Sequence, residues 1–190
     1  MSQLSFCQLT DSHIISCAQV VSSAYNVIAG QFGFQPDADL SRLVESLRKS
    51  LAAQGRLYGA FAGEVQVGAF LLLPQEGDVY ELTMLSVIPS RQGIGYGSQL
   101  LRAAEKTVLE LGGFALVCTI IDEYALLKQM LLKFGFQESL CGRPVGAPCN
   151  ICVMQKQLTS ASPQVPGYDV LDGDRVLHYA GTSCAGCSQS

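Results

Sequence analysis

With 190 residues, 48% of them hydrophobic and 15% charged, the chain has the size of one globular domain with a sizeable core, which excludes disorder throughout. Its net charge is −4 and no basic cluster exceeds the pair Arg48–Lys49, which excludes electrostatic binding of nucleic acid. Because no apolar run reaches the length of a membrane span and the first residues lack a signal-peptide pattern, we expect a cytoplasmic protein that does not bind a membrane.

The first half of the chain contains four strand patterns and two helical patterns. Short apolar runs bounded by turn residues predict strands over residues 4–9, 57–62, 65–73 and 79–87. The fourth of these strands is apolar on both faces, which indicates a central place in its sheet. A helix is expected after the first strand, with Asp11 and Ser12 as candidate caps. Apolar residues at spacings of three and four predict a second helix, which starts after Pro36-Asp37 and is closed by Gly55.

The second half continues the alternation of strands and helices. Helical patterns cover residues 95–111 and 123–134, and apolar runs predict strands over residues 114–121, 136–140 and 151–158. Asp122 is the candidate cap of the second helix. Residues 79–121 form a strand–helix–strand unit, for which we expect parallel strands and a right-handed crossover. Beyond them, residues 159–167 have the composition of a linker, and residues 168–179 could form a small hairpin.

The most distinctive segment is a glycine-rich turn at the start of the helix over residues 95–111. Gly93, Gly95 and Gly97 stand at alternate positions there. The first turn of a helix leaves backbone N–H groups without partners and carries partial positive charge, and glycines let an anion come close to them. The turn lacks the lysine of a P-loop and the G-x-G-x-x-G spacing of a dinucleotide fold. It therefore predicts a phosphate-binding turn with the pattern Q-x-x-G-x-G, which starts at Gln92.

In its setting, this turn resembles the coenzyme-binding motif of the GNAT family, the Gcn5-related N-acetyltransferases. It follows an E-L-x-M-L-x-V-x-P strand that starts at Glu81, and a K-x-G-F-like segment comes later at Lys133–Phe136. The order of elements over most of residues 4–158 is also similar to that of the family. The resemblance implies an α/β fold with a mixed, mainly antiparallel sheet, a parallel central strand pair and about four helices. We expect residues 1–158 to form this acetyltransferase domain, followed by a C-terminal extension over residues 159–190 without an assigned role.

The resemblance also implies how acetyl-CoA, the expected co-substrate, would bind. The backbone of the turn would hold the diphosphate through Gln92, Gly93, Ile94, Gly95, Tyr96, Gly97 and Ser98. The end of the preceding strand would pair with the pantetheine amides through Leu85, Ser86 and Val87. Members of the family splay the two parallel strands to admit this arm, and one backbone N–H there would polarise the thioester carbonyl.

Two residues are candidates for catalysis. Acetyl transfer to an amine needs a neutral amine, so a base or a water chain must take its proton. Glu81 stands among apolar neighbours, at the spacing where the histone-acetyltransferase branch of the family carries its base. The alternatives are that it is hydrogen-bonded to the backbone or that it orients the substrate without taking a proton. Many members place an acidic tyrosine four residues before the glycine of K-x-G-F, but here that position is Leu131. Tyr124, on the same predicted helix, either serves as the acid or packs in the core, and a third alternative uses no protein acid.

The eight cysteines are expected to be free thiols, because the predicted compartment keeps them reduced. Cys149-x-x-Cys152 and Cys184-x-x-Cys187 together have the spacing of a zinc site, but each pair alone is a weak signal, and we expect no metal. Cys118 lies in an apolar run that indicates an inert core thiol rather than an acyl carrier.

The sequence therefore predicts an N-acetyltransferase that moves an acetyl group from acetyl-CoA to a primary amine by direct attack in a ternary complex. The acceptor is a small-molecule amine or a peptide amine, and the protein is a monomer or a homodimer. Two alternatives stay open, an acyl-CoA-binding sensor with little turnover and an acetyltransferase for protein N-termini or lysines.

Overall fold

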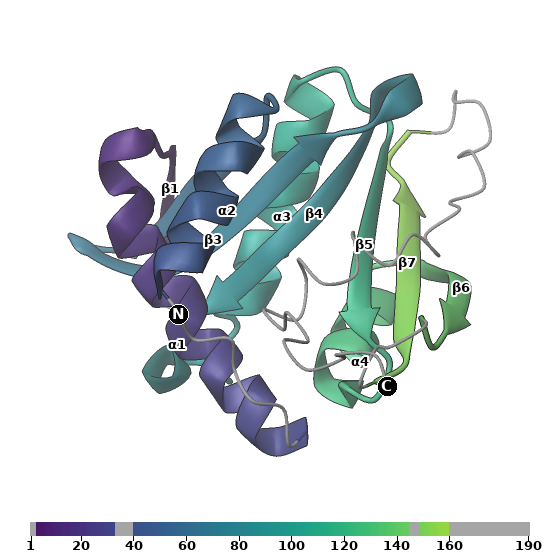
Figure 1. Cartoon of the computed structure of the whole chain (residues 1–190). Helices are drawn as coiled ribbons and strands as arrows, with labels where there is room; N and C mark the ends of the chain where they lie inside the picture. Colours follow the sequence, from purple (N-terminus) through teal and green to yellow (C-terminus); the bar gives the residue numbers. More distant parts are fainter. Residues whose placement is uncertain (1–2, 33–39, 145–148, 160–190) are drawn as a thin grey trace, which may run out of the picture.

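The structure, a computed structural model, describes residues 3–32, 40–144 and 149–159, which form one seven-stranded sheet in the order β1-β2-β3-β4-β5-β7-β6. The strands are β1 Ser5–Gln8, β2 Arg56–Ala62, β3 Val65–Pro74, β4 Val79–Val87, β5 Ala115–Ile121, β6 Gln137–Gly142 and β7 Ile151–Gln157. All neighbours are antiparallel except β4 and β5, which are parallel (Figure 1). The predicted mixed sheet with a parallel central pair is confirmed.

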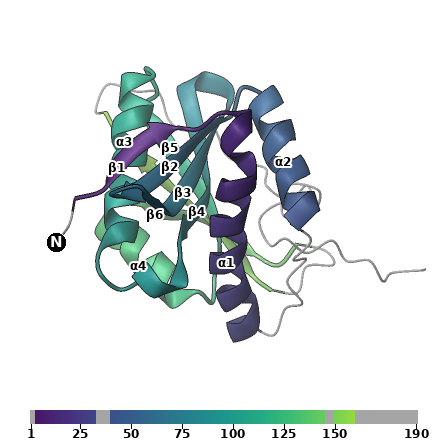
Figure 2. The ribbon, with the colours of Figure 1, turned by 90° about the vertical axis from the view of Figure 1, so that its left-hand side faces the viewer.

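Four α-helices cover the two faces of the sheet within the described residues. They are α1 Ile14–Phe32, α2 Leu40–Ala52, α3 Tyr96–Glu110 and α4 Ala125–Lys133. Figure 2 shows α1 and α2 on one face, with α3 and α4 on the other. None of the described helices is long and apolar enough to cross a bilayer.

Each face of the sheet has its own apolar core, which explains why the central strands are apolar on both sides. Leu100 and Leu101 of α3 and Leu131 of α4 pack with alternate residues of the central strands on one face. On the other face, Ile14 of α1 and Leu47 of α2 lie in a second cluster with the alternate residues of β3. Because successive strand residues point to opposite faces, the period of two in the sequence builds both cores at once.

Two local predictions at α4 are wrong. The helix begins at Ala125, and Tyr124 rather than Asp122 is the residue that precedes it as N-cap. The side chain of Asp122 instead accepts a hydrogen bond from Lys128, at 2.6 Å. The carboxylate of Asp122 thus forms an ion pair with a lysine in the first turn of the helix, whereas the capping pattern predicted that it would accept hydrogen bonds from the backbone N–H groups there.

Several predictions lie outside the described residues. The start of the second helix after Pro36-Asp37 falls in residues 33–39, and α2 is described from Leu40. The linker and hairpin predicted within residues 159–179 lie almost wholly outside as well, so the division into a domain over residues 1–158 and an extension stays a prediction.

Candidate active site

The site begins where the two parallel strands separate. β4 and β5 are paired only from Val79 to Glu81 on β4 and from Ala115 to Val117 on β5. Beyond these residues the strands diverge toward their carboxyl ends, and Figure 1 shows them far apart at the level of α4. A parallel pair that opens in this way makes room for an extended ligand to pair with main-chain groups as an added strand would.

An irregularity in β4 accompanies the separation. Leu71 and Ala69 of β3 are two residues apart, but their partners on β4, Thr83 and Ser86, are three residues apart, so β4 contains one extra residue here. The extra residue is Met84 or its neighbour, and Met84 has a φ of 54°, in the left-handed region. Such a β-bulge bends its strand and re-aims the groups that follow it. It lies directly before Leu85–Val87, the segment predicted to pair with pantetheine.

Ser86 carries a second unusual feature within this segment. Its side chain is 3% exposed, and its hydroxyl oxygen has no hydrogen-bond partner among the described residues. A buried hydroxyl without a partner is costly, so each such group in a folded protein needs an explanation, such as a functional role or a bound water. The hydroxyl is thus a polar group of β4 that a bound molecule or a water could satisfy.

The glycine-rich turn follows β4 and ends at the start of α3. Gly93 and Gly95 have φ values of 76° and 88°, a conformation that suits glycine, and Gly95 caps the helix without a side chain. The described residues provide no acceptor for the backbone N–H groups of residues 93–98. A Cβ atom at Gly93 would meet no atom within 4 Å, so the backbone there is open. These donors and the helix dipole make the turn suited to an anion.

Glu81 lies at the point where the pairing of β4 and β5 ends. It is the last residue of β4 that pairs with β5, where it lies opposite Val117, and on its other side it pairs with Leu73 of β3. Alternation along the strand places its side chain on the face that carries α1 and α2, opposite that of Leu82, which packs in the α3 and α4 core. The carboxylate is half-buried, and Gln75 Nε2 donates to its Oε2 at 3.2 Å.

Tyr124 lies at the other end of the opening, three residues beyond β5. Its ring contacts Phe32 at the end of α1 edge-on, with centroids 6.1 Å apart. Burial raises the pKa of its phenol, so the group keeps its proton. Val117, which pairs with Glu81, lies four residues before the end of β5, or roughly 13 Å along the strand. The structure therefore places the two candidate catalytic residues at opposite ends of the opening, with Leu131 buried in the core.

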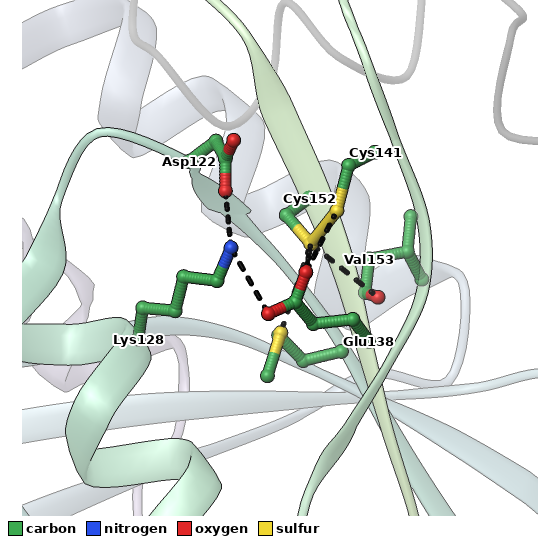
Figure 3. The surroundings of a disulfide bond; sticks show 7 residues. Asp122, Lys128, Glu138, Cys141, Cys152 and Val153 are labelled. Atoms are coloured by element: carbon green, nitrogen blue, oxygen red, sulfur yellow. Dashed lines mark hydrogen bonds and ion pairs between the residues drawn. A yellow bond between two sulfur atoms is a disulfide. The ribbon is translucent and has the colours of Figure 1, made fainter.

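The expectation that all eight cysteines are free is wrong for one pair. Cys141 of β6 and Cys152 of β7 form a disulfide (Figure 3). The described cysteines outside this pair, Cys7, Cys17, Cys118 and Cys149, are free. Two facing strand positions, which the spacing in the sequence does not reveal, bring the bonded sulfurs together.

The metal pattern read from the sequence is also changed. Cys152 is bonded to Cys141 rather than placed beside Cys149 as a ligand pair, and Cys184 and Cys187 lie outside the described residues. The described residues contain one group that could hold a metal ion, Asp122 with the sulfurs of Cys141 and Cys152. In this state the two sulfurs are bonded to each other and Asp122 is paired with Lys128, so all three donors have partners.

Cys118 has the properties of a core thiol. It is 5% exposed, and burial, together with the nearby charge of Glu81, raises the pKa of its thiol. A thiol that resists ionisation is a poor nucleophile, in agreement with the prediction that it does not carry the acyl group.

Sequence reasoning missed the partners of the candidate residues. Gln75, which holds Glu81, stands in a turn six residues earlier, and no motif marks it. Phe32, which meets Tyr124, is the last residue of a helix far away in the sequence. The bulge at Met84 was missed because neither glycine nor asparagine stands there to indicate a left-handed residue.

Comparison with known proteins agrees with this geometry. The family model described as the Acetyltransferase (GNAT) family matches residues 22–136. The comparison with curated protein sequences gives no match.

Many solved structures share the fold. The ribosomal-protein-S18-alanine N-acetyltransferase from Escherichia coli aligns with a TM-score of 0.69 and 13% identity, over 86% of this chain and 99% of its own. The PaiA N-acetyltransferase from Thermoplasma acidophilum, solved with coenzyme A, gives a TM-score of 0.66 and 17% identity, over 82% and 99% of the two chains. A Bacillus subtilis acetyltransferase in complex with CoA gives 0.62 and 18%, over 83% and 99%. At these identities the likeness establishes the fold.

Proposed function

Because the chain belongs to the GNAT family of acetyltransferases, we propose that it moves an acetyl group from acetyl-CoA to a primary amine by direct attack in a ternary complex. The observation that carries this proposal is the separation of β4 and β5 beyond Glu81. β4 then leads through the glycine-rich turn into a helix start whose backbone N–H groups have no acceptor among the described residues. A ligand with an extended amide arm and a diphosphate matches both features. Two structural neighbours, from Thermoplasma acidophilum and Bacillus subtilis, were solved with coenzyme A, which supports the proposed coenzyme.

In this proposal, different residues of the opening bind different parts of the coenzyme. The diphosphate accepts hydrogen bonds from the backbone of the turn, through Gln92, Gly93, Ile94, Gly95, Tyr96, Gly97 and Ser98. The pantetheine amides pair with Leu85, Ser86 and Val87, beyond the bulge. A backbone N–H of this segment polarises the thioester carbonyl. It stabilises the oxyanion that forms in the transition state strongly, because this N–H is already held in place before the reaction.

Glu81 is proposed to take the proton of the attacking amine, directly or through a water. It faces the layer of α1 and α2, so the acceptor is expected to enter from that side of the sheet. Its hydrogen bond from Gln75 holds the carboxylate in one orientation. The amine nitrogen forms a bond to the acetyl carbon, the carbon–sulfur bond of acetyl-CoA breaks, and the thiolate leaves with a proton from water or from the amine.

Two other functions are kept as alternatives. A sensor that binds acyl-CoA with little turnover is favoured by one observation, the buried Leu131 at the position where many family members carry an acidic tyrosine. An enzyme for protein N-termini or lysines differs only in its acceptor, and the structural neighbour from Escherichia coli is such an N-acetyltransferase for a ribosomal protein. The proposal includes a cytoplasmic monomer or homodimer without a metal.

The test is incubation of the full chain with acetyl-CoA and a library of small amines and peptides. We expect release of free coenzyme A thiol together with an acetylated product detected by mass spectrometry. Binding of acetyl-CoA without release of coenzyme A thiol in the presence of any acceptor would support the sensor, and a lack of acetyl-CoA binding in calorimetry would contradict both functions.

Replacing Tyr124 with phenylalanine is expected to leave kcat unchanged. Tyr124 follows the carboxyl end of β5, whereas Glu81 lies where the β4–β5 pairing ends, and phenylalanine retains the ring contact with Phe32. Steady-state rates of thiol release measure the effect. As a control, Tyr124→Leu removes the ring and should lower the melting temperature. A drop in kcat of more than about tenfold in the phenylalanine variant would instead make Tyr124 the general acid.

A further inference from the structure

Cys141 and Cys152 occupy directly opposite positions on β6 and β7. β6 lies at the edge of the sheet, and all six of its residues are exposed. Cys141 is therefore open to solvent, whereas the side chain of Cys152 is fully buried. A small reagent can thus reach one sulfur of the pair and not the other.

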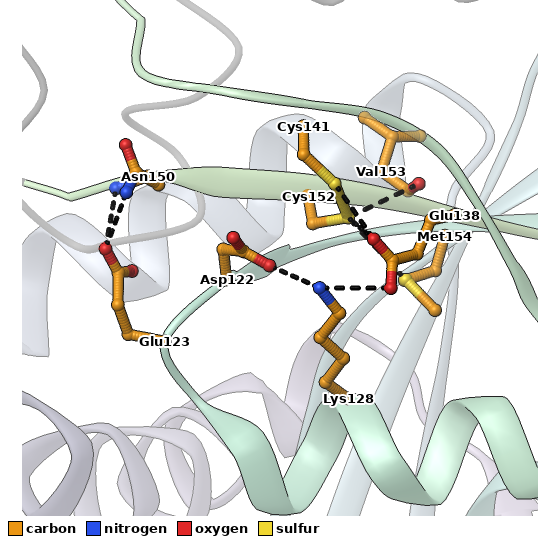
Figure 4. Close-up of polar contacts among 9 residues, drawn as sticks. All are labelled: Asp122, Glu123, Lys128, Glu138, Cys141, Asn150, Cys152, Val153 and Met154. Atoms are coloured by element: carbon orange, nitrogen blue, oxygen red, sulfur yellow. Dashed lines mark hydrogen bonds and ion pairs between the residues drawn. A yellow bond between two sulfur atoms is a disulfide. The ribbon is translucent and has the colours of Figure 1, made fainter.

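Three charged groups lie near the pair, on α4, on β6 itself and in the segment after β5 (Figure 4). Lys128 Nζ of α4 lies 2.6 Å from Asp122 Oδ1, after β5, and 3.1 Å from Glu138 Oε1 of β6. Glu138 Oε2, in turn, lies 3.5 Å from Cys141 Sγ and 3.8 Å from Cys152 Sγ. The hydrogen bonds to Asp122 and Glu138 raise the pKa of Lys128, so its positive charge persists beside the sulfurs.

These contacts suit the reduced pair as well as the oxidised one. After reduction each sulfur carries a hydrogen, and the carboxylate of Glu138 is already within reach of both. When the disulfide is reduced, the buried thiol can donate a hydrogen bond to this carboxylate, so reduction leaves no buried donor without an acceptor. The ammonium of Lys128 compensates the carboxylate in either state.

We propose that Cys141 and Cys152 form a reversible thiol–disulfide site, which a hydroperoxide closes and a dithiol opens. In closing, the Cys141 thiolate attacks the peroxide, so that a sulfur–oxygen bond forms and the oxygen–oxygen bond breaks. Cys152 then displaces the hydroxyl from that sulfur, and two thiols and one hydrogen peroxide give a disulfide and two waters. In opening, one thiolate of the dithiol attacks the exposed Cys141 sulfur, and its second thiol resolves the mixed disulfide, which leaves two protein thiols and an oxidised dithiol.

The closed state ties an exposed edge strand to its neighbour. Without the bond, β6 is held by main-chain pairing to β7 on one side and by the ion pair of Glu138 with Lys128. We therefore expect the amides of residues 137–142 to exchange hydrogen faster in the reduced protein, and its melting temperature to fall by about 5 °C.

The site is tested by alkylation of the full chain with N-ethylmaleimide, in the presence of a chelator, followed by peptide mass spectrometry. After dithiothreitol under native conditions we expect label on Cys141, and after hydrogen peroxide the same peptides should be joined by the disulfide and free of label. Exposed Cys7 is an internal control that should be labelled after the dithiothreitol treatment. A pair that resists dithiothreitol in the folded protein, or thiols that stay unpaired after peroxide, would overturn the proposal. This readout requires no acetyl transfer, so the test of the thiol–disulfide site does not depend on whether the proposed function is correct.

The surrounding charges provide a second test. Glu138→Gln removes a negative charge beside Cys141, which favours the thiolate, and should speed oxidation by peroxide about threefold. Lys128→Met removes the positive charge and should slow it by a similar factor. Glu64→Gln, in the exposed turn between β2 and β3, is the matched control and should oxidise at the wild-type rate. Equal rates in all three variants would overturn a role of the charged groups in the reaction.

Discussion

Replacing Glu81 with glutamine is expected to lower kcat about a hundredfold while acetyl-CoA binds as tightly as before. Glutamine keeps the size of the side chain and can still pair with Gln75, but it cannot take a proton. The deficit should be largest near neutral pH and shrink toward about pH 10, because an alkylamine is then increasingly neutral without a base. Rates of thiol release with the best acceptor across this pH range, and calorimetry with acetyl-CoA, measure the two effects.

The matched control for this variant is Glu64→Gln, which makes the same change in an exposed turn. It should retain the wild-type kcat at every pH. If Glu81→Gln also retains it, Glu81 is not the base. If the variant loses affinity for acetyl-CoA with kcat unchanged, Glu81 has a binding role instead.

Replacing Gly93 with alanine is expected to weaken binding of acetyl-CoA about tenfold or more, which corresponds to at least about 1.4 kcal/mol. Gly93 has a φ of 76°, a conformation that an alanine adopts at a cost of about 1–2 kcal/mol. The backbone would relax away from this conformation, and its N–H groups would no longer converge on the diphosphate. Calorimetric titration with acetyl-CoA measures the dissociation constant.

Gly63→Ala separates binding from backbone strain. Gly63 has a φ of 65° in the turn between β2 and β3, and, as at Gly93, an added Cβ would meet no atom within 4 Å. Both variants should therefore lose similar free energy of unfolding, whereas only Gly93→Ala should lose affinity for the coenzyme. Equal dissociation constants for the two variants would contradict the assignment of the turn to phosphate binding.

The elements of this fold were predictable because their signals are local. The apolar residues on both faces of β4 predicted a central strand, and the glycines before α3 predicted the start of a helix. A buried central strand and a helix that begins at Tyr96 confirm both predictions. The parallel pairing of β4 with β5 follows from the crossover helix between them. At α4, the capping rule failed because Lys128 competes for Asp122, a contact that depends on the shape of the helix end.

The site was less predictable because it depends on contacts between distant residues. The glycines of the turn indicate unpartnered N–H groups directly, but the separation of β4 and β5 after Glu81 leaves no mark in either strand. The partner of Tyr124 comes from α1, about ninety residues earlier in the chain. The bond between Cys141 and Cys152 depends on the register of β6 against β7, and register follows from the turn between them and from packing rather than from cysteine spacing.

The short pairing of β4 with β5 also bears on how the protein behaves in solution. Past Glu81 and Val117, the sheet has two facing edges that no other described strand pairs. Unpaired edges are templates for strands of other molecules, and here they belong to two strands whose residues past Glu81 and Val117 are mostly buried. We therefore expect the heated protein to aggregate through these two strand edges. A molecule that binds between them in the folded protein should delay aggregation by mass action. Coenzyme A added during purification would then act as a folding stabiliser as well as a ligand.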